Sequence, residues 1–298
     1  MPVDIFSDNN MLYTLRTQII FSPMPEKKYN LLPDYERPPV IEVVYGIQFS
    51  PLIELRTPQI GLFWQTIKND YPKFKEMPVL APVIERFDQE GKTEQPTLEF
   101  LQEAPLPRMF FLDTHENWVM QIQNDRFLHN WKRVNDEDIY PRYEAVSDKF
   151  FQAWGRFCEF CRAESISTPK LNQLELTYIN HIPVHANSTV GEEITAIFPD
   201  IVWRKNHEFL PIPESLSWKT SFLLPKNQGR LHASLRHATR IKDKTPTLLL
   251  ELTARGIPPT AELPQIKKWF SLSREWIVRG FSDLTNSEVQ KNVWIRKT

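Results

Sequence analysis

Apolar and polar side chains alternate along several stretches of the chain, which is the pattern of half-buried β-strands. The first stretch, Val40–Phe49, follows Pro38-Pro39, a pair that fits just before a strand but not inside one. Further strands are predicted at Arg108–Asp113, Trp118–Gln123, Gln173–Ile182, Leu216–Leu224, Gly229–Arg236 and Thr247–Ala254. The first two of these read as a hairpin that turns at residues 115–117, and the last three read as an antiparallel meander.

Other stretches carry apolar residues at helical spacing. Thr57-Pro58 starts one helix, with the threonine as its cap, and Tyr71-Pro72 ends it. Tyr140-Pro141 opens the longest helix, and a further long helix is predicted at Pro264–Phe281. The longest helix has one apolar face, made of Tyr143, Phe150, Trp154, Phe157 and Cys161.

Strands followed by a long helix, twice along the chain, predict an α+β fold in which antiparallel sheet is packed by two long helices. Residues 1–34 are expected to be an N-terminal extension, followed by a first α+β half at 35–185 and a second at 186–298. Two similar halves and one continuous domain both remain open. Shorter strands are predicted at 11–21, 79–87 and 97–101.

The composition excludes several classes of protein. The chain has 298 residues, 41% of them hydrophobic, and a net charge of −1, which fits an ordinary globular protein. Its 8 glycines are scattered, so the glycine-rich loops that cradle nucleotide phosphates are absent. Only two cysteines occur, and neither a signal sequence nor a run of about 20 apolar residues is visible. We therefore expect a soluble, cytoplasmic protein.

No motif identifies a catalytic, cofactor or metal site. Cys158 and Cys161 form a C-x-x-C, but they lie several turns inside the longest predicted helix and lack further zinc ligands at suitable spacing, so they read as packing residues. The stretch Asp88–Lys92 has the acidic-x-Lys spacing of metal-dependent nucleases, yet Gly91 and its polar neighbours favour a solvated turn. We predict no catalytic residue, no metal and no cofactor.

Charge is distributed unevenly along the chain. Residues 80–125 carry an excess of six negative charges, and residues 203–242 carry an excess of six positive charges. If Gly229–Arg236 is a strand, its basic side chains share one face, and such a face can bind phosphates or an acidic protein. The residues predicted to bind a partner are Arg204, Arg230, His232, Arg236 and Arg240. The alternative is that the acidic and basic regions face each other within the fold or across a homodimer.

Several phrases resemble a sporadically distributed family of uncharacterised prokaryotic proteins. They are Pro38-Pro39-Val40 with Glu42-Val43, Gln121 to Phe127, Tyr140 to Glu144, and Tyr178-Ile179-Asn180. The resemblance covers most of residues 37–296 but carries no known activity or site residue. Its sporadic distribution is typical of defence or toxin–antitoxin loci.

We therefore expect a non-enzymatic, protein-binding or regulatory protein whose partner is another protein from the same locus, with a homo-oligomer as a further option. Three alternatives remain open. One is a nucleic-acid- or phosphate-binding protein that uses the basic region 203–242, although no base-stacking platform is visible. Another is an enzyme of unknown type. The third is a small-ligand protein with a cavity between sheet and long helix.

Overall fold

The computed structural model describes residues 31–85, 87, 106–184, 190–202, 209–210, 213–240 and 242–298. The chain divides into two units after Leu31, and every element below belongs to the second unit, Leu32–Thr298. The short strands expected at 11–21 and 97–101 lie outside the described residues.

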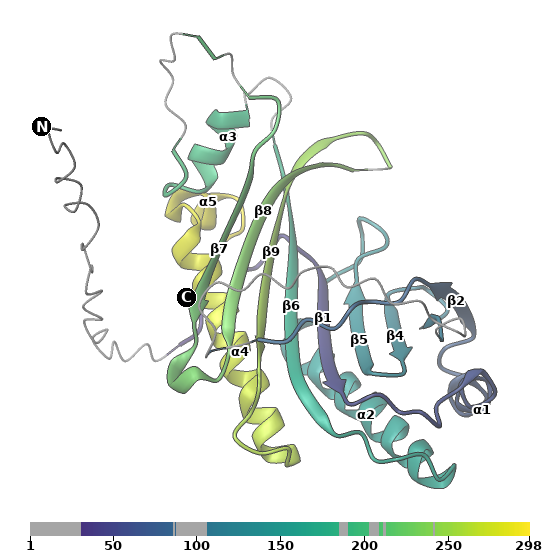
Figure 1. Ribbon diagram of the computed structural model, residues 1–298. Helices are drawn as coiled ribbons and strands as arrows, with labels where there is room; N and C mark the ends of the chain where they lie inside the picture. Colours follow the sequence, from purple (N-terminus) through teal and green to yellow (C-terminus); the bar gives the residue numbers. More distant parts are fainter. Residues whose placement is uncertain are drawn as a thin grey trace, which may run out of the picture. The chain divides into compact units, whose positions relative to one another are not determined.

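The described residues build one nine-stranded sheet with the order β2-β3-β4-β5-β1-β6-β9-β8-β7, in which all neighbours are antiparallel (Figure 1). The strands are β1 (Val40–Phe49), β2 (Lys73–Met77), β3 (Arg108–Leu112), β4 (Trp118–Gln123), β5 (Arg126–Lys132), β6 (Leu171–Pro183), β7 (Ser217–Leu223), β8 (Arg230–Thr239) and β9 (Pro246–Gly256). The prediction of an α+β fold with antiparallel sheet is confirmed, as are the hairpin β3–β4 and the meander β7–β8–β9.

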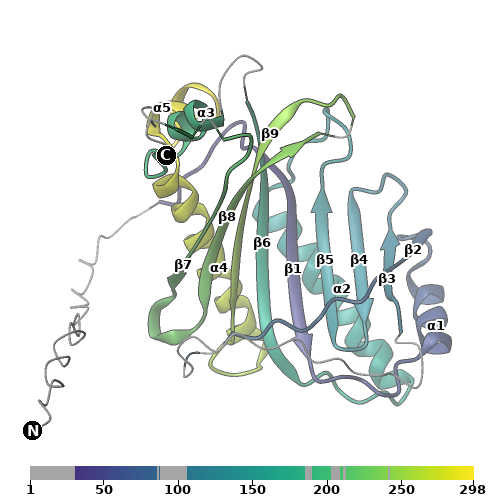
Figure 2. The ribbon, with the colours of Figure 1, turned by 45° about the horizontal axis from the view of Figure 1, so that its top comes forward.

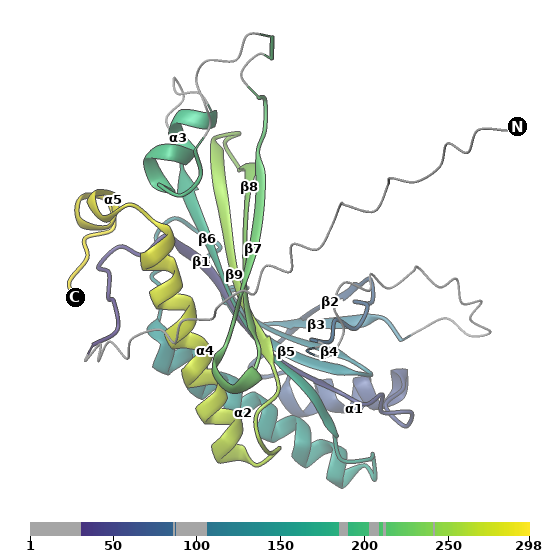
Figure 3. The same ribbon diagram turned by 60° about the vertical axis from the view of Figure 1, so that its left-hand side comes forward.

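The helices are α1 (Thr57–Ile67), α2 (Arg142–Ala163), α3 (Val190–Ile197), α4 (Leu263–Leu284) and α5 (Ser287–Asn292), and a 3-10 turn, η1 (Pro225–Asn227), joins β7 to β8. Both α2 and α4 have 22 residues, and both lie against the same face of the sheet (Figure 3). Apolar side chains of α2 recur at spacings of three and four, as in Val146, Phe150, Ala153 and Phe157, so one stripe of the helix is buried.

The core lies between the sheet and these helices. Tyr45, at the centre of β1, stacks on Phe150 of α2 with 4.9 Å between ring centroids and contacts Phe270 of α4 at 4.8 Å. Two turns further along α2, Phe157 stacks on Phe49 of β1 at 6.1 Å. Burial of each such side chain contributes about 1.5–3 kcal/mol to stability, so aromatic contacts fasten both long helices to the central strands.

The order of elements repeats within the sheet. From the centre outward, one side runs β1-β5-β4-β3, with β2 added at its edge, and the other runs β6-β9-β8-β7. Along the chain, each series begins with its central strand, β1 or β6, which is followed by a shorter helix, α1 or α3. The outer strands come next, and the last of them, β5 or β9, pairs with the central strand and leads into the long helix, α2 or α4. The second series therefore starts at β6, a strand that the sequence boundaries place in the first half.

Two local predictions are wrong. Among residues 79–85 and 87 no strand forms: β2 ends at Met77, and Pro78 and Pro82 have no N–H to donate to a sheet. Thr57 does not cap α1. It is the first residue of the helix, and Arg56 occupies the cap position, where its side chain makes no capping hydrogen bond.

Candidate binding site on the polar face of the sheet

The alternation of side chains gives the sheet one apolar and one polar face. In β6, the buried Leu174, Leu176 and Tyr178 share the side of the strand that packs on the helices. Gln173 and Glu175 alternate with them and point to the opposite side, which we call the polar face. Helices pack on one side of the sheet, and this explains why apolar and polar residues alternate so regularly along the strands.

Residues 78–85, which we call the strap, cross the strands on the polar face (Figure 2). Gln123 of β4 holds the start of the strap with both ends of its side-chain amide. Its Oε1 accepts a hydrogen bond from the Leu80 backbone N–H at 2.9 Å, and its Nε2 donates to the Leu80 carbonyl oxygen at 3.0 Å. Arg126 of β5 donates from Nη2 to the Ala81 carbonyl oxygen at 3.0 Å.

The next part of the strap is held in the same way by the two central strands. Gln48 of β1 and Gln173 of β6 both donate from Nε2 to the Val83 carbonyl oxygen. Gln173 also accepts from the Glu85 backbone N–H at 2.7 Å. The three glutamines are nearly fully buried, so each needs these partners to offset the loss of water. Side chains of the sheet thus bind the backbone of an extended segment.

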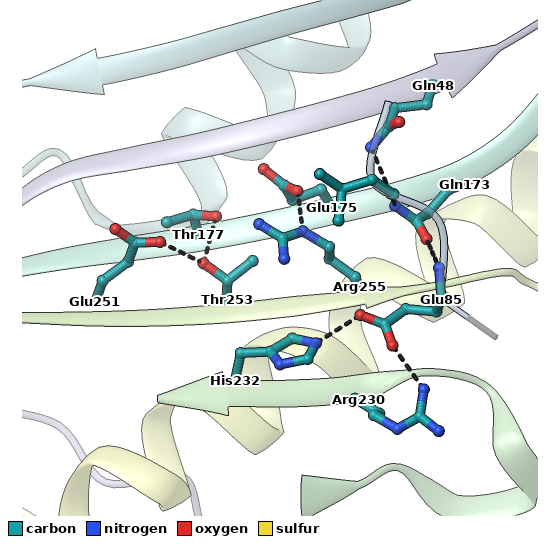
Figure 4. Close-up of polar contacts among 11 residues, drawn as sticks. Gln48, Glu85, Gln173, Glu175, Thr177, Arg230, His232, Glu251, Thr253 and Arg255 are labelled. Atoms are coloured by element: carbon teal, nitrogen blue, oxygen red, sulfur yellow. Dashed lines mark hydrogen bonds and ion pairs between the residues drawn. The ribbon is translucent and has the colours of Figure 1, made fainter. Parts of the chain in front are cut away.

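The strap ends in an ion-paired carboxylate. Glu85 accepts hydrogen bonds from Arg230 Nη1 at 2.7 Å and from His232 Nε2 at 2.5 Å, both on β8 (Figure 4). The side chain of Glu85 is only 7% exposed. Burial by itself raises the pKa of Glu85, but the hydrogen bonds and charges of His232 and Arg230 outweigh it and lower the pKa below its usual value. The Arg230 guanidinium also lies over the Phe87 ring at 4.6 Å.

More polar pairs continue across β6 and β9 beside the strap. Arg255 donates from Nε to Glu175, and the hydroxyls of Thr177 and Thr253 lie 2.9 Å apart (Figure 4). Thr253 also hydrogen-bonds to Glu251 at 3.2 Å. Beside the strap, the polar side chains of β6, β8 and β9 therefore form an ordered hydrogen-bonded network.

The structure places four of the five residues predicted to bind a partner. Arg230 and His232 hold Glu85, as described above. Arg240 forms ion pairs with Asp243 and Asp136. Arg236 is exposed on the polar face of β8 and has no ion pair within the described residues. Arg204 lies outside the described residues.

The alternative in which acidic and basic regions face each other within the fold holds at Glu85, which comes from the acidic region and pairs with the basic one. The three glutamines that hold the strap were not among the predicted site residues. Their signal was present, since Gln48, Gln123 and Gln173 are amides inside or at the end of strand-like runs, where apolar or β-branched residues are more usual.

The two cysteines lie inside α2, where Cys161 is buried and Cys158 half-buried. Burial raises the pKa of Cys158 to about 11 and that of Cys161 to about 12, so both remain thiols at neutral pH. Within the described residues, no group of three or more His, Cys, Asp or Glu side chains is arranged to hold a metal ion.

Comparison of the sequence with models of known protein families gives no match, and comparison with curated proteins gives none either. Among the described helices, none is long and apolar enough to span a membrane.

Proposed function

We propose that this protein is a non-enzymatic binding protein that recognises an extended, acidic segment of a protein partner on the polar face of its sheet. The observation that carries this proposal is the strap. The sheet binds the strap through backbone groups at Leu80, Ala81, Val83 and Glu85 and through one acidic side chain. A surface that binds one extended segment through its backbone and a single carboxylate has the chemistry to bind another segment that carries carboxylates.

The partner would bind where cations on this face have no internal counter-charge. Arg236 of β8 and Lys219 of β7 are both exposed, and neither has an ion pair within the described residues. Their neighbours across the strands are Ser217 and Ser234, which add hydroxyl groups for hydrogen bonds. We expect exposed charges of this kind to set the association rate and the specificity more than the affinity.

β7 also lies at the edge of the sheet, so one side of its backbone is unpaired in the described sheet. An extended partner segment at this edge can gain backbone hydrogen bonds as well as the contacts to Arg236 and Lys219. We expect the partner to be encoded at the same locus.

The test is affinity purification of the tagged full-length protein from its native host, at moderate and at high salt, with mass spectrometry and nucleic-acid staining. Arg236→Glu with Lys219→Glu reverses two charges on the polar face and should abolish recovery of the partner. The matched control is Lys68→Glu with Lys268→Glu, two exposed lysines at α1 and in α4 on the helical side. This control should recover the partner as the wild type does.

Two results contradict the proposal. One is a partner that the polar-face variant still recovers, provided that circular dichroism shows the same fold. The other is recovery of nucleic acid that is lost at high salt, because release of counterions makes phosphate binding strongly salt-dependent. That second result would favour the nucleic-acid alternative.

A further inference from the structure

A separate pocket of about 440 Å³ lies on the other side of the sheet. It is bounded by the first turn of α2 and the C-terminal half of α4, and its floor is formed by β6 and β9. Residues 33–35 complete the wall, held in place by antiparallel hydrogen bonds to the C-terminal segment, such as Glu36 N–H to the Ile295 carbonyl oxygen at 3.0 Å. The volume falls within the ~300–1,000 Å³ of typical small-molecule sites.

Three short phrases of the chain meet at this pocket. They are Pro38-Pro39-Val40 before and at the start of β1, Tyr140 to Glu144 at the start of α2, and Tyr178 with Asn180 in β6. These phrases are far apart in the sequence, so their convergence is a property of the fold. None of them takes part in the contacts of the strap.

The floor of the pocket holds a pair of buried phenols. The hydroxyls of Tyr140 and Tyr178 lie 3.2 Å apart, and both side chains are more than nine-tenths buried. One hydrogen bond joins them, so only one of their two protons is used, and neither hydroxyl has another partner among the described residues. Burial raises the pKa of Tyr140 to about 12 and raises the pKa of Tyr178 well above its usual value, so the unused proton stays available to a ligand.

Asn180 adds a second polar group to the floor. Its side chain is 4% exposed, and its Nδ2 donates to the Leu250 carbonyl oxygen at 3.2 Å. The amide oxygen has no hydrogen-bond partner among the described residues. Because this oxygen is not sealed from solvent, it can accept a hydrogen bond from a ligand or a water in the pocket. The floor therefore offers one unused donor and one unused acceptor.

The rim is cationic and aromatic. Arg142, Arg274 and Lys297 face Asp34 and Glu144, which leaves an excess of one positive charge. Arg142 pairs with Asp34 at 3.1 Å and Arg274 with Glu144 at 3.2 Å, but both carboxylates are more than half exposed, so these ion pairs are weak and can rearrange.

Two further features of the rim favour a flat, anionic ligand. The Arg274 guanidinium lies 4.1 Å from the centroid of the Tyr143 ring, which makes a planar surface beside the pocket. The first turn of α2 has no side-chain cap within the described residues, and its unpaired N–H groups add to the positive potential.

We propose that this pocket binds a small aromatic anion. The aromatic ring packs among Tyr143, Ile277 and Phe281. A polar group on the ring reaches the hydroxyls of Tyr140 and Tyr178, and the anionic group lies near Arg142 and Arg274. A carboxylate and a phosphate share this chemistry. The site is independent of the polar face, so it stands whether or not a protein partner binds there.

The experiment titrates the full-length protein with 4-hydroxybenzoate and with 4-hydroxyphenyl phosphate, using isothermal calorimetry and thermal unfolding at constant ionic strength. The uncharged counterparts are 4-hydroxybenzamide and hydroquinone. At least one anion should bind saturably and raise the melting temperature, and its counterpart should bind at least tenfold more weakly. The arm that responds distinguishes a carboxylate ligand from a phosphate ligand.

Two variants locate the binding. Tyr178→Phe removes one hydroxyl but keeps the ring, and Arg274→Gln removes the cation. Each should weaken binding of the responding anion at least tenfold. Arg156→Gln is the matched control, because this α2 arginine also forms an exposed ion pair, with Asp70, away from the pocket. The proposal is overturned if neither anion binds more tightly than its uncharged counterpart, or if both pocket variants bind as tightly as the control.

Discussion

As the pH is lowered, His129 should make this protein lose stability at a higher pH than that at which most proteins begin to unfold. Its side chain lies in β5 on the apolar face of the sheet and is fully buried. The ring stacks on Trp118 with 5.7 Å between centroids, and Nε2 lies 2.8 Å from the Tyr71 hydroxyl. Burial, and to a lesser degree the positive charge of Lys149, lowers the pKa of His129 from 6.5 to about 3.

The direction of the effect follows from proton linkage. Below pH 6.5 the unfolded chain binds a proton at His129, but the folded protein does not until the pH approaches 3. Stability from this residue is therefore fully present above pH 6.5 and is lost as the pH falls toward 3. Between pH 8 and pH 5 the loss amounts to about 2 kcal/mol, since one pKa unit corresponds to about 1.4 kcal/mol.

The measurement is denaturant unfolding at pH 8 and pH 5 for the wild type and for His129→Gln. Glutamine can still accept a hydrogen bond from Tyr71, but it does not titrate. Other groups titrate over this range too, including His237, whose pKa is lowered, and Glu42, whose pKa is raised. They contribute equally to both proteins, so the comparison isolates His129.

The wild type should lose about 2 kcal/mol more than the variant between the two pH values. Tyr71→Phe is the control. It removes the hydroxyl but leaves the histidine, so it should keep the pH dependence of the wild type. Equal losses in the wild type and in His129→Gln would refute the reasoning, because the imidazole would then titrate alike in the folded and unfolded states.

Three further changes test the fold and the strap by equilibrium unfolding. Gly155→Ala, in the middle of α2 with no atom within 4 Å of the added Cβ, should raise stability by about 1 kcal/mol, and an unchanged or lower value would contradict this. Gly256→Ala should be strongly destabilising, because its Cβ would lie 1.9 Å from the Gln228 carbonyl oxygen, and wild-type stability would show that the β8–β9 ladder adapts. Glu85→Gln should cost about 1–3 kcal/mol by removing the carboxylate that accepts hydrogen bonds from Arg230 and His232, whereas no loss would show that the strap is not held through its carboxylate.

The strands and helices were predictable because each follows a single periodicity. In β8, alternation alone places Arg230, His232 and Arg236 on one face, and the structure confirms this arrangement. The same holds for the buried stripe of α2, where Phe150 and Phe157 are among the core residues. Such patterns arise because one side of a regular element is buried, and one-sided burial produces a regular spacing of apolar residues in the sequence.

The strap was mispredicted as a strand because its sequence has a strand-like content, with Val83 and Ile84 among its residues. What decides its structure is a set of hydrogen-bond partners on other strands. The side chain of Gln173 forms hydrogen bonds with the Glu85 N–H and the Val83 carbonyl, which in a strand would pair with a neighbouring strand. No local pattern records such a partner, so this part of the candidate site required the fold.

The pocket of tyrosines was equally hidden, and for a related reason. Tyr140 is the second residue before α2, and Tyr178 lies in the middle of β6, so neither sequence context distinguishes them from ordinary core residues. Both are in fact buried, as a core prediction requires. What distinguishes them from other core residues is that their hydroxyls pair with each other near the start of α2. This pairing leaves one phenolic proton without an acceptor among the described residues.

The repeated order of elements explains why the two candidate sites lie on opposite faces. The two series meet at β1 and β6. The long helices that end the two series, α2 and α4, therefore lie side by side over the centre of the sheet, and the pocket lies between their ends and the sheet. The opposite face has no helix among the described elements, and its polar residues need other partners. The strap supplies them along one row, from Gln123 in β4 to Arg230 in β8. Beyond that row Arg236 and Lys219 stay exposed, which is why we assign the partner to this end of the face and the small ligand to the other side.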